Sequence, residues 1–224
     1  MRRTSALWTP TSPDLSYRAM SVVRELRRRL GADPARSRFE ACLPRLAKEP
    51  PAGRDWIHEI KHDGFRIIAR RDAAGVRLVT LNGYDFADRF PLIVEAIAAL
   101  PASSCVVDGE AIAVDENGLS VFDLIRYRRQ DHSVTLCAFD LLELDGEDLR
   151  RTPIEVRKAT LKGLLRRTHA GVAFNRHFEA AGESVYRHAC ALGCEGIVRN
   201  VSARRIGSAD RTIGSRLRTR HRRR

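Results

Sequence analysis

A lysine, two acids and an arginine lie close together in EIKHDGFR, residues 59–66, and these residue types can carry out phosphoryl chemistry. If the segment is a strand, Glu59, Lys61 and Asp63 project from one face, because strand side chains alternate between two faces. An uncharged lysine amine is a nucleophile, and nearby carboxylates can hold a metal ion or a sugar hydroxyl. A cation such as Arg66 would favour the uncharged amine. The simpler interpretation is an ordinary strand lysine beside a hairpin with an Asp-Gly turn.

Three further residues occupy motifs that fit the same chemistry. Glu110 follows an Asp-Gly pair in VVDGEAIAV, where its carboxylate could hold a ribose hydroxyl or a metal, although another hairpin is the ordinary interpretation. Phe139 in CAFDLLELDG has apolar neighbours, which is typical of a core aromatic as well as of a wall for a purine. Glu195 precedes the apolar run of EGIVRN, where a solvated strand-end carboxylate is common. Taken singly, these residues indicate no more than a nucleotide-binding domain.

The elements that must position these residues alternate irregularly between strands and helices. Strand patterns occur at 56–60, 65–71, 76–81, 132–149 and 195–200, with a hairpin-like pair at 105–118. Helical spacing of apolar residues occurs at 90–101, 121–130, 154–168 and 183–193. The sequence therefore predicts an α+β fold of antiparallel sheets packed with helices.

Basic residues are concentrated at the two ends of the 224-residue chain. Residues 1–50 contain 11 Lys and Arg against 5 Asp and Glu, and residues 202–224 contain 9 against 1. We expect a mostly disordered basic arm over 1–37, one domain over 38–201, and a disordered Arg-rich tail over 202–224. The formal net charge of +12 supports a polyanionic partner only weakly, because the middle of the chain is slightly acidic.

Cysteine usage indicates a reducing compartment, and hydropathy indicates neither a membrane span nor a signal peptide. The chain has 5 cysteines and no C-x-x-C pair, which argues against a disulfide framework and against a zinc ribbon. No apolar run approaches the roughly 20 residues of a membrane span, and no signal peptide is recognisable. We therefore expect a cytoplasmic protein with no membrane partner.

Taken in order, the motifs resemble the adenylation (nucleotidyltransferase) domain of ATP-dependent DNA ligases, most closely the ligase module of bacterial end-joining ligases. The resemblance covers about residues 39–200. It rests on FEACLPRLAKEPPAG, EIKHDGFR, NGYDFADRFP, VVDGEAIAVDENG, AFDLLELDGEDL and HFEAAGESVYRHACALGCEGIVRN. It implies an ATP-grasp-like nucleotidyltransferase fold, ATP and Mg²⁺ or Mn²⁺ as cofactors, and a role in DNA repair and recombination.

The resemblance also implies a role for each matched residue. Lys61 would attack the α-phosphate of ATP to form lysyl-AMP, and the adenylate would pass to a DNA 5′-phosphate before nick sealing. Arg66 and Glu59 would lie by the nucleotide, Glu110 by the ribose and Phe139 against the adenine. Metal ligands would be Glu195 and Asp63.

The sequence departs from the family pattern in three places. Leu81 stands where the family usually has an arginine. After EGIV the family continues to a W-x-K-x-K pattern, but our alignment places Thr212, Gly214 and Arg216 at its tryptophan and two lysines. We expect that loss to weaken phosphate binding, since removing one preorganised donor costs about 10² to 10³ in rate. The Arg-rich tail is also what a shifted reading frame would produce.

The third departure is the absence of a recognisable OB-fold domain after the matched region. We therefore expect DNA, at nicks or ends, as partner, with a separate OB-fold or end-joining protein supplying the missing grip, and a monomeric, nucleoid-associated bacterial enzyme. One alternative is a truncated, catalytically impaired relic that acts at most as a DNA-binding protein. Another is an RNA substrate, because RNA ligases and capping guanylyltransferases share the lysine motif.

Overall fold

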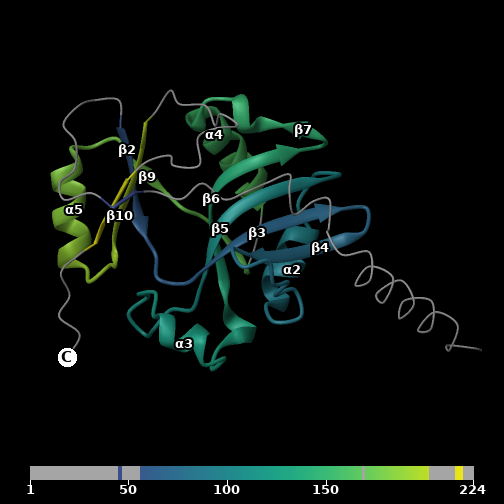
Figure 1. Ribbon diagram of the computed structural model, residues 1–224, viewed down its shortest axis with the longest axis horizontal. Coiled ribbons are helices and arrows are strands. Elements are labelled where there is room, and N and C mark those ends of the chain that lie inside the picture. The colour runs from purple at the N-terminus through teal and green to yellow at the C-terminus, as the bar shows by residue number, and fades with distance from the viewer. Residues whose placement is uncertain (1–44, 47–55, 168–169, 202–214, 219–224) are drawn as a thin grey trace, which may run out of the picture. The chain divides into compact units, whose positions relative to one another are not determined.

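Two β-sheets carry the residues of interest in the computed structural model, which describes residues 45–46, 56–167, 170–201 and 215–218. In the first sheet, here called sheet A, the strand order is β1-β11-β10-β2-β9. Its members are β1 (Arg45–Leu46), β2 (Trp56–Lys61), β9 (His177–Phe178), β10 (Gly196–Val201) and β11 (Ser215–Arg218). Strand β2, which ends at the candidate nucleophile, thus lies between β10 and β9 (Figure 1).

The second sheet, sheet B, has the order β4-β3-β5-β6-β7, with β8 paired to β6. Its members are β3 (Phe65–Asp72), β4 (Gly75–Thr80), β5 (Cys105–Ile112), β6 (Thr135–Leu144), β7 (Glu147–Asp148) and β8 (Val172–Phe174). The pairs β6–β8 and β1–β11 are parallel, and the other ladders within the described residues are antiparallel. The expected α+β class is confirmed, although the sheets are mixed rather than purely antiparallel.

Helices cover one face of each sheet. The helices are α2 (Pro91–Ala98), α3 (Phe122–Arg126), α4 (Ile154–Leu164) and α5 (Gly182–Ala191), with the 3₁₀ turns η1 (Asp131–Ser133), η2 (Leu149–Arg151) and η3 (Leu165–Arg167). Ile93 and Ile97 of α2 are fully buried in the main core with the inward side chains of sheet B. Val185 and Ala189 of α5 pack with Ile197 of sheet A in a second, smaller cluster. Figure 1 shows α5 beside β10 and β2.

Neither Asp-Gly pair forms the hairpin turn that the sequence suggested. The chain leaves β2 at Lys61 and passes through Gly64 into β3, which belongs to the other sheet. An added Cβ at Gly64 would lie 2.2 Å from the carbonyl oxygen of Ala111. Asp108-Gly109 lies inside the continuous strand β5, where a Cβ on Gly109 would lie 2.7 Å from Leu136. Both glycines are required by close packing rather than by turn geometry.

The expected terminal segments lie largely outside the described residues. No described residue falls in the arm over 1–37, and of the boundary 201/202 only residue 201 is described. Residues 215–218 form β11, antiparallel to β10, whereas the sequence predicted disorder throughout 202–224. Backbone pairing along a strand edge does not require a hydrophobic side-chain pattern, so composition gave no sign of this strand. Within the described part of the chain, the helices are too short or too polar to cross a bilayer.

Replacement of Gly64 by Ala tests the close connection between the sheets. We expect Gly64→Ala to lower the free energy of unfolding by about 1–3 kcal/mol, because backbone atoms must move to admit the methyl group. Gly163→Ala is the matched control, since no atom lies within 4 Å of its added Cβ. That change in α4 should raise stability by about 0.5–1 kcal/mol. Urea denaturation of both variants measures the contrast, and equal effects would contradict the packing argument.

Candidate active site

Lys61 and Glu195 are in direct contact although 134 residues separate them in the sequence. Lys61 is the last residue of β2 and pairs with Gly196, the first residue of β10. This register brings Glu195, one residue earlier, beside the lysine. The Lys61 Nζ donates a short hydrogen bond to the Glu195 Oε2, and the two side chains are only 18% and 20% exposed. The candidate nucleophile therefore faces an acid inside the fold rather than bulk water.

Arg66 and Glu110 meet on sheet B, where they are direct partners across β3 and β5. The Arg66 guanidinium makes a two-pronged ion pair with Asp108, with Nε 2.6 Å from Oδ1 and Nη2 2.8 Å from Oδ2. Burial raises the pKa of Glu110 to about 7, although the positive charges of Arg66 and Lys61 oppose the rise. Glu110 is thus held in a desolvated, positively charged setting close to the nucleophile.

Phe139 is the extra residue of an irregular register in β6. Ala138 pairs with Gly109 and Asp140 pairs with Asp108, so no residue of β5 is opposite Phe139. Such bulges redirect side chains and occur beside active sites. The Phe139 ring is half-buried and lies 4.3 Å from the Arg66 guanidinium carbon. The structure therefore brings the expected base wall and the expected nucleotide-binding arginine together, with the cation over the ring.

Glu59 is buried and committed to protein donors. Its side chain is 4% exposed, and its Oε1 accepts a hydrogen bond of 2.7 Å from Lys158 Nζ. Asn200 donates to its Oε2 at 3.1 Å, and Asn175 makes a longer contact of 3.4 Å with Oε1. We predicted contact with the nucleotide, but in this structure both carboxylate oxygens face the scaffold. These hydrogen bonds fix the position of β2, the strand that carries Lys61.

Sequence reasoning missed the cations of α4 that support the site. Lys158 is fully buried, and besides Glu59 it donates to the carbonyl oxygen of Phe139 at 2.9 Å. Its neighbour Arg157 makes a two-pronged ion pair with Asp140, at 2.8 and 2.9 Å. The signal was the pair Arg-Lys on a helix whose apolar positions are few, but a solvent-facing role is the usual interpretation of such a pair.

A divalent metal ion fits this set of acids only if a substrate completes its coordination. Within the described ranges, no three His, Cys, Asp or Glu side chains converge into a group that could hold a metal. Mg²⁺ commonly takes one or two carboxylates and completes its shell with water and phosphate oxygens. Glu195 fits that role. For Asp63, the other expected ligand, the structure shows its backbone N–H donating to Ser120 Oγ at 3.1 Å.

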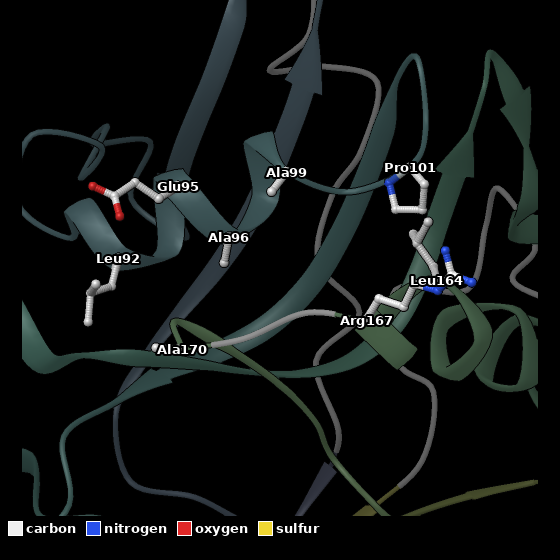
Figure 2. Close-up of a pocket in the computed structure, with 8 residues that line it drawn as sticks. All are labelled: Leu92, Glu95, Ala96, Ala99, Pro101, Leu164, Arg167 and Ala170. Atoms are coloured by element: carbon white, nitrogen blue, oxygen red, sulfur yellow. The ribbon is translucent and has the colours of Figure 1, made fainter.

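A hollow of about 260 Å³ lies elsewhere, between α2 and the segment that follows α4 (Figure 2). Its lining is Leu92, Glu95, Ala96, Ala99, Pro101, Leu164, Arg167 and Ala170. None of the residues expected to do chemistry takes part in it. The candidate site is therefore defined by the convergence of charged groups between the sheets.

Comparison with known proteins gives a consistent result. Residues 38–204 match the family model described as "ATP dependent DNA ligase domain". The chain is 33% identical over 174 residues to the multifunctional non-homologous end joining protein LigD of Pseudomonas aeruginosa, covering 76% of this chain and 20% of that protein. It is 34% identical to a probable DNA ligase of Beutenbergia cavernae, covering 62% of this chain and 29% of that protein. The chain thus spans less than a third of these relatives.

The fold resembles solved ligase domains. The ligase domain from M. tuberculosis LigD has a TM-score of 0.64 and 27% identity, covering 79% of this chain and 60% of that one. A mycobacterial DNA ligase D solved with ATP and MES has a TM-score of 0.66 and 26% identity, with the same coverage. These similarities confirm the expected nucleotidyltransferase fold.

Removal of the buried Lys158 charge should destabilise the protein strongly. We expect Lys158→Met to lower the free energy of unfolding by about 3–5 kcal/mol, because Glu59 would be left in a buried site without its cationic partner. Adding Glu59→Gln should restore part of the loss. Lys162→Met, at an exposed position of the same helix, should change stability by no more than about 0.5 kcal/mol. The denaturant midpoints of the variants measure these differences. A Lys158→Met protein as stable as the wild type would show that the Lys158–Glu59 ion pair does not stabilise the fold.

The raised pKa of Glu110 predicts a pH dependence of stability. A carboxyl that holds its proton more tightly when folded makes the folded state lose stability as pH rises from about 4.5 to about 7. Glu110→Gln removes this titration. The variant should therefore gain stability relative to the wild type across that interval, as measured by urea denaturation at several pH values. A constant difference between the two proteins would show that Glu110 titrates normally.

Proposed function

The chain belongs to the family of ATP-dependent DNA ligase domains, and from that premise we propose that it catalyses its own adenylation on Lys61. The observation that carries the proposal is the contact between Lys61 and Glu195, with Glu110, Arg66 and Phe139 around them. These groups come from β2, β3, β5, β6 and the residue just before β10, so only the folded chain assembles them. An amine, acids and a cation beside an aromatic ring are what nucleotide transfer to lysine requires.

In the proposed reaction the lysine amine forms a bond to the α-phosphorus of ATP, and the bond from that phosphorus to pyrophosphate breaks. The amine must give up a proton to attack, and the Glu195 carboxylate that contacts Lys61 Nζ would accept it and pass it to water. A divalent cation, Mg²⁺ or Mn²⁺, held at Glu195 together with Asp63, would offset phosphate charge and weaken the hold of Glu195 on the amine. Arg66 is placed to donate to phosphate oxygens.

The nucleoside would be positioned by the remaining residues. Phe139 offers a flat apolar wall for adenine once the purine shares or displaces the Arg66 guanidinium. Glu110, with its pKa raised to about 7, is well suited to a ribose hydroxyl because a partly protonated carboxyl can both donate and accept. Glu59 would act indirectly by fixing β2, since its oxygens are bonded to Lys158 and Asn200.

We extend the proposal to DNA because relatives are named as DNA ligases and end-joining proteins. The adenylate would pass from Lys61 to the 5′-phosphate at a nick or end, and the 3′-hydroxyl would then displace AMP. A separate OB-fold or end-joining protein would close over the DNA. We propose a monomer in the bacterial cytoplasm, associated with the nucleoid.

Incubation with ATP labelled in the α-phosphate and with Mg²⁺ or Mn²⁺ tests the proposal. Wild-type protein should acquire label that survives denaturing electrophoresis and that warm acid, but not alkali, releases, as expected of a phosphoramidate, whereas Lys61→Ala should acquire none. Lys162→Ala, which changes an exposed lysine on α4, should label as the wild type does. Glu195→Gln should label roughly 10²-fold more slowly. A folded wild-type protein that takes up no label under any metal condition would leave the impaired relic as the better reading.

A further inference from the structure

Three arginines and an exposed tyrosine follow one another at the C-terminal end of helix α3. We call Arg126, Tyr127, Arg128 and Arg129 the basic cluster; all four are exposed, and the tyrosine retains 58% of its accessible surface. The guanidinium carbons of Arg126 and Arg129 lie 5.4 and 5.8 Å from the centre of the Tyr127 ring. The aromatic ring thus gathers two cations beside it in water, where cation–π contacts are weak but orienting.

The backbone presents this cluster in an unfavourable conformation. Arg129 N–H donates to the Leu124 carbonyl at 3.1 Å and Arg128 N–H to the Ile125 carbonyl at 3.3 Å, which is the Schellman pattern of a helix end. The residue in the left-handed position is Arg128, with φ of 57°. Glycine is the favoured residue at that position because a Cβ is strained there. Arg128 adopts this strained conformation and projects a side chain that is 72% exposed.

The nearest acid in the following turn is already engaged. Asp131 accepts hydrogen bonds from Arg89 Nε at 2.8 Å and from Arg89 Nη2 at 3.0 Å. Arg128 Nε is 4.0 Å from Asp131, and its side chain is 72% exposed. Asp123 of α3 is a further exposed acid of this segment. Three arginines therefore face solvent with little neutralisation, which leaves a positive surface for a partner of negative charge.

The segment that carries the cluster is fixed to the loop beside the candidate nucleophile. Ser120 accepts a hydrogen bond from the Asp63 N–H at 3.1 Å, and the Phe122 ring lies 5.1 Å from the Phe65 ring. Arg89 lies over the Phe65 ring at 5.3 Å and also donates to the Ile125 carbonyl. Figure 1 shows α3 beyond the ends of β3 and β5. The cluster is thus attached to both sides of the Lys61–Phe65 connection.

We propose that the basic cluster binds the phosphate backbone of duplex DNA next to the strand break. This inference rests on the proposed function, because it assigns a DNA-contacting surface beside the same site. Arginine guanidinium groups match phosphate oxygens in two-pronged geometry, and several together neutralise adjacent phosphates. Tyr127 would keep Arg126 and Arg129 in position. The cluster would act after adenylation, when the 5′-phosphate approaches Lys61.

A structural role for the arginines makes a different prediction. Cations near a helix C-terminus stabilise the helix by interaction with its dipole. Their removal would then lower thermal stability and leave the salt dependence of DNA binding unchanged. A phosphate-binding role requires the opposite, because each phosphate contact releases counterions and adds about 0.9 to the slope of log K against log salt.

The decisive variant is Arg126→Gln, Arg128→Gln, Arg129→Gln in the full chain. Binding of a nicked duplex, followed by fluorescence anisotropy between about 50 and 200 mM salt, should lose roughly two to three from that slope. The control is Lys162→Gln, Arg166→Gln, Arg167→Gln, which removes the same charge from exposed positions of α4 and η3. The control slope should stay close to that of the wild type. Equal slopes for the two variants would overturn the proposal.

Arg128→Gly separates the backbone from the charge. Glycine relieves the strain at the left-handed position, so the melting temperature should stay the same or rise. The salt slope of DNA binding should nevertheless fall by roughly one. A variant that binds DNA as the wild type does, with unchanged slope, would show that this arginine only ends the helix.

Adenylation measured on the same preparations keeps the two proposals distinct. The triple variant of the basic cluster should acquire label from ATP at the wild-type rate, because none of its residues touches the nucleotide. Transfer of AMP to the nicked duplex should slow, and excess DNA should restore it. Failure of wild-type labelling would refute the proposed function while the contrast in salt slopes still decided the DNA surface. An unaltered transfer rate at limiting DNA would count against the cluster.

Discussion

One buried ammonium group links the two sheets. Lys158 of α4 donates to Glu59 on sheet A at 2.7 Å and to the Phe139 carbonyl on sheet B at 2.9 Å. Burial removes this ammonium group from water, and the Glu59 carboxylate and the Phe139 carbonyl accept its hydrogen bonds instead. Glu59 is two residues before Lys61 on the same face of β2. Lys158 therefore links the strand that carries Lys61 to the strand that carries Phe139.

Buried ion pairs, rather than a second apolar core, occupy the region between the two sheets. Asp108 and Asp140 are direct neighbours across β5 and β6, and each is matched by its own arginine. Burying such pairs costs more desolvation energy than apolar packing would, so they are poor devices for stability alone. In the proposed function, Arg66 would exchange its contact with Asp108 for a phosphate. The core between sheet B and α2 supplies the apolar burial that compensates.

Sequence reasoning found the elements but not their pairing. Strand and helix patterns depend on local periodicity, and so the segments over 56–60, 65–71 and 183–193 are close to the observed β2, β3 and α5. Local chemistry predicts hairpin turns at the two Asp-Gly pairs. In the structure, their glycines instead allow close contacts between segments that are far apart in the sequence. Likewise, nothing local identifies Lys158 as buried. Its burial depends on an acid 99 residues away.

The Lys61–Phe65 connection joins the candidate nucleophile to the segment that carries the basic cluster. Lys61 precedes it, its Asp63 amide is bonded to Ser120, and its far end is packed through Phe65 on Phe122. A displacement of α3 by bound DNA would therefore be transmitted to Asp63, two residues after Lys61, with few intervening atoms. The Lys61–Phe65 connection is tightly packed at Gly64, because a Cβ there would overlap the Ala111 carbonyl. Rigid packing of this kind transmits small shifts rather than absorbing them. DNA bound as proposed at the basic cluster would therefore be coupled to the Lys61 amine through this connection and two contacts.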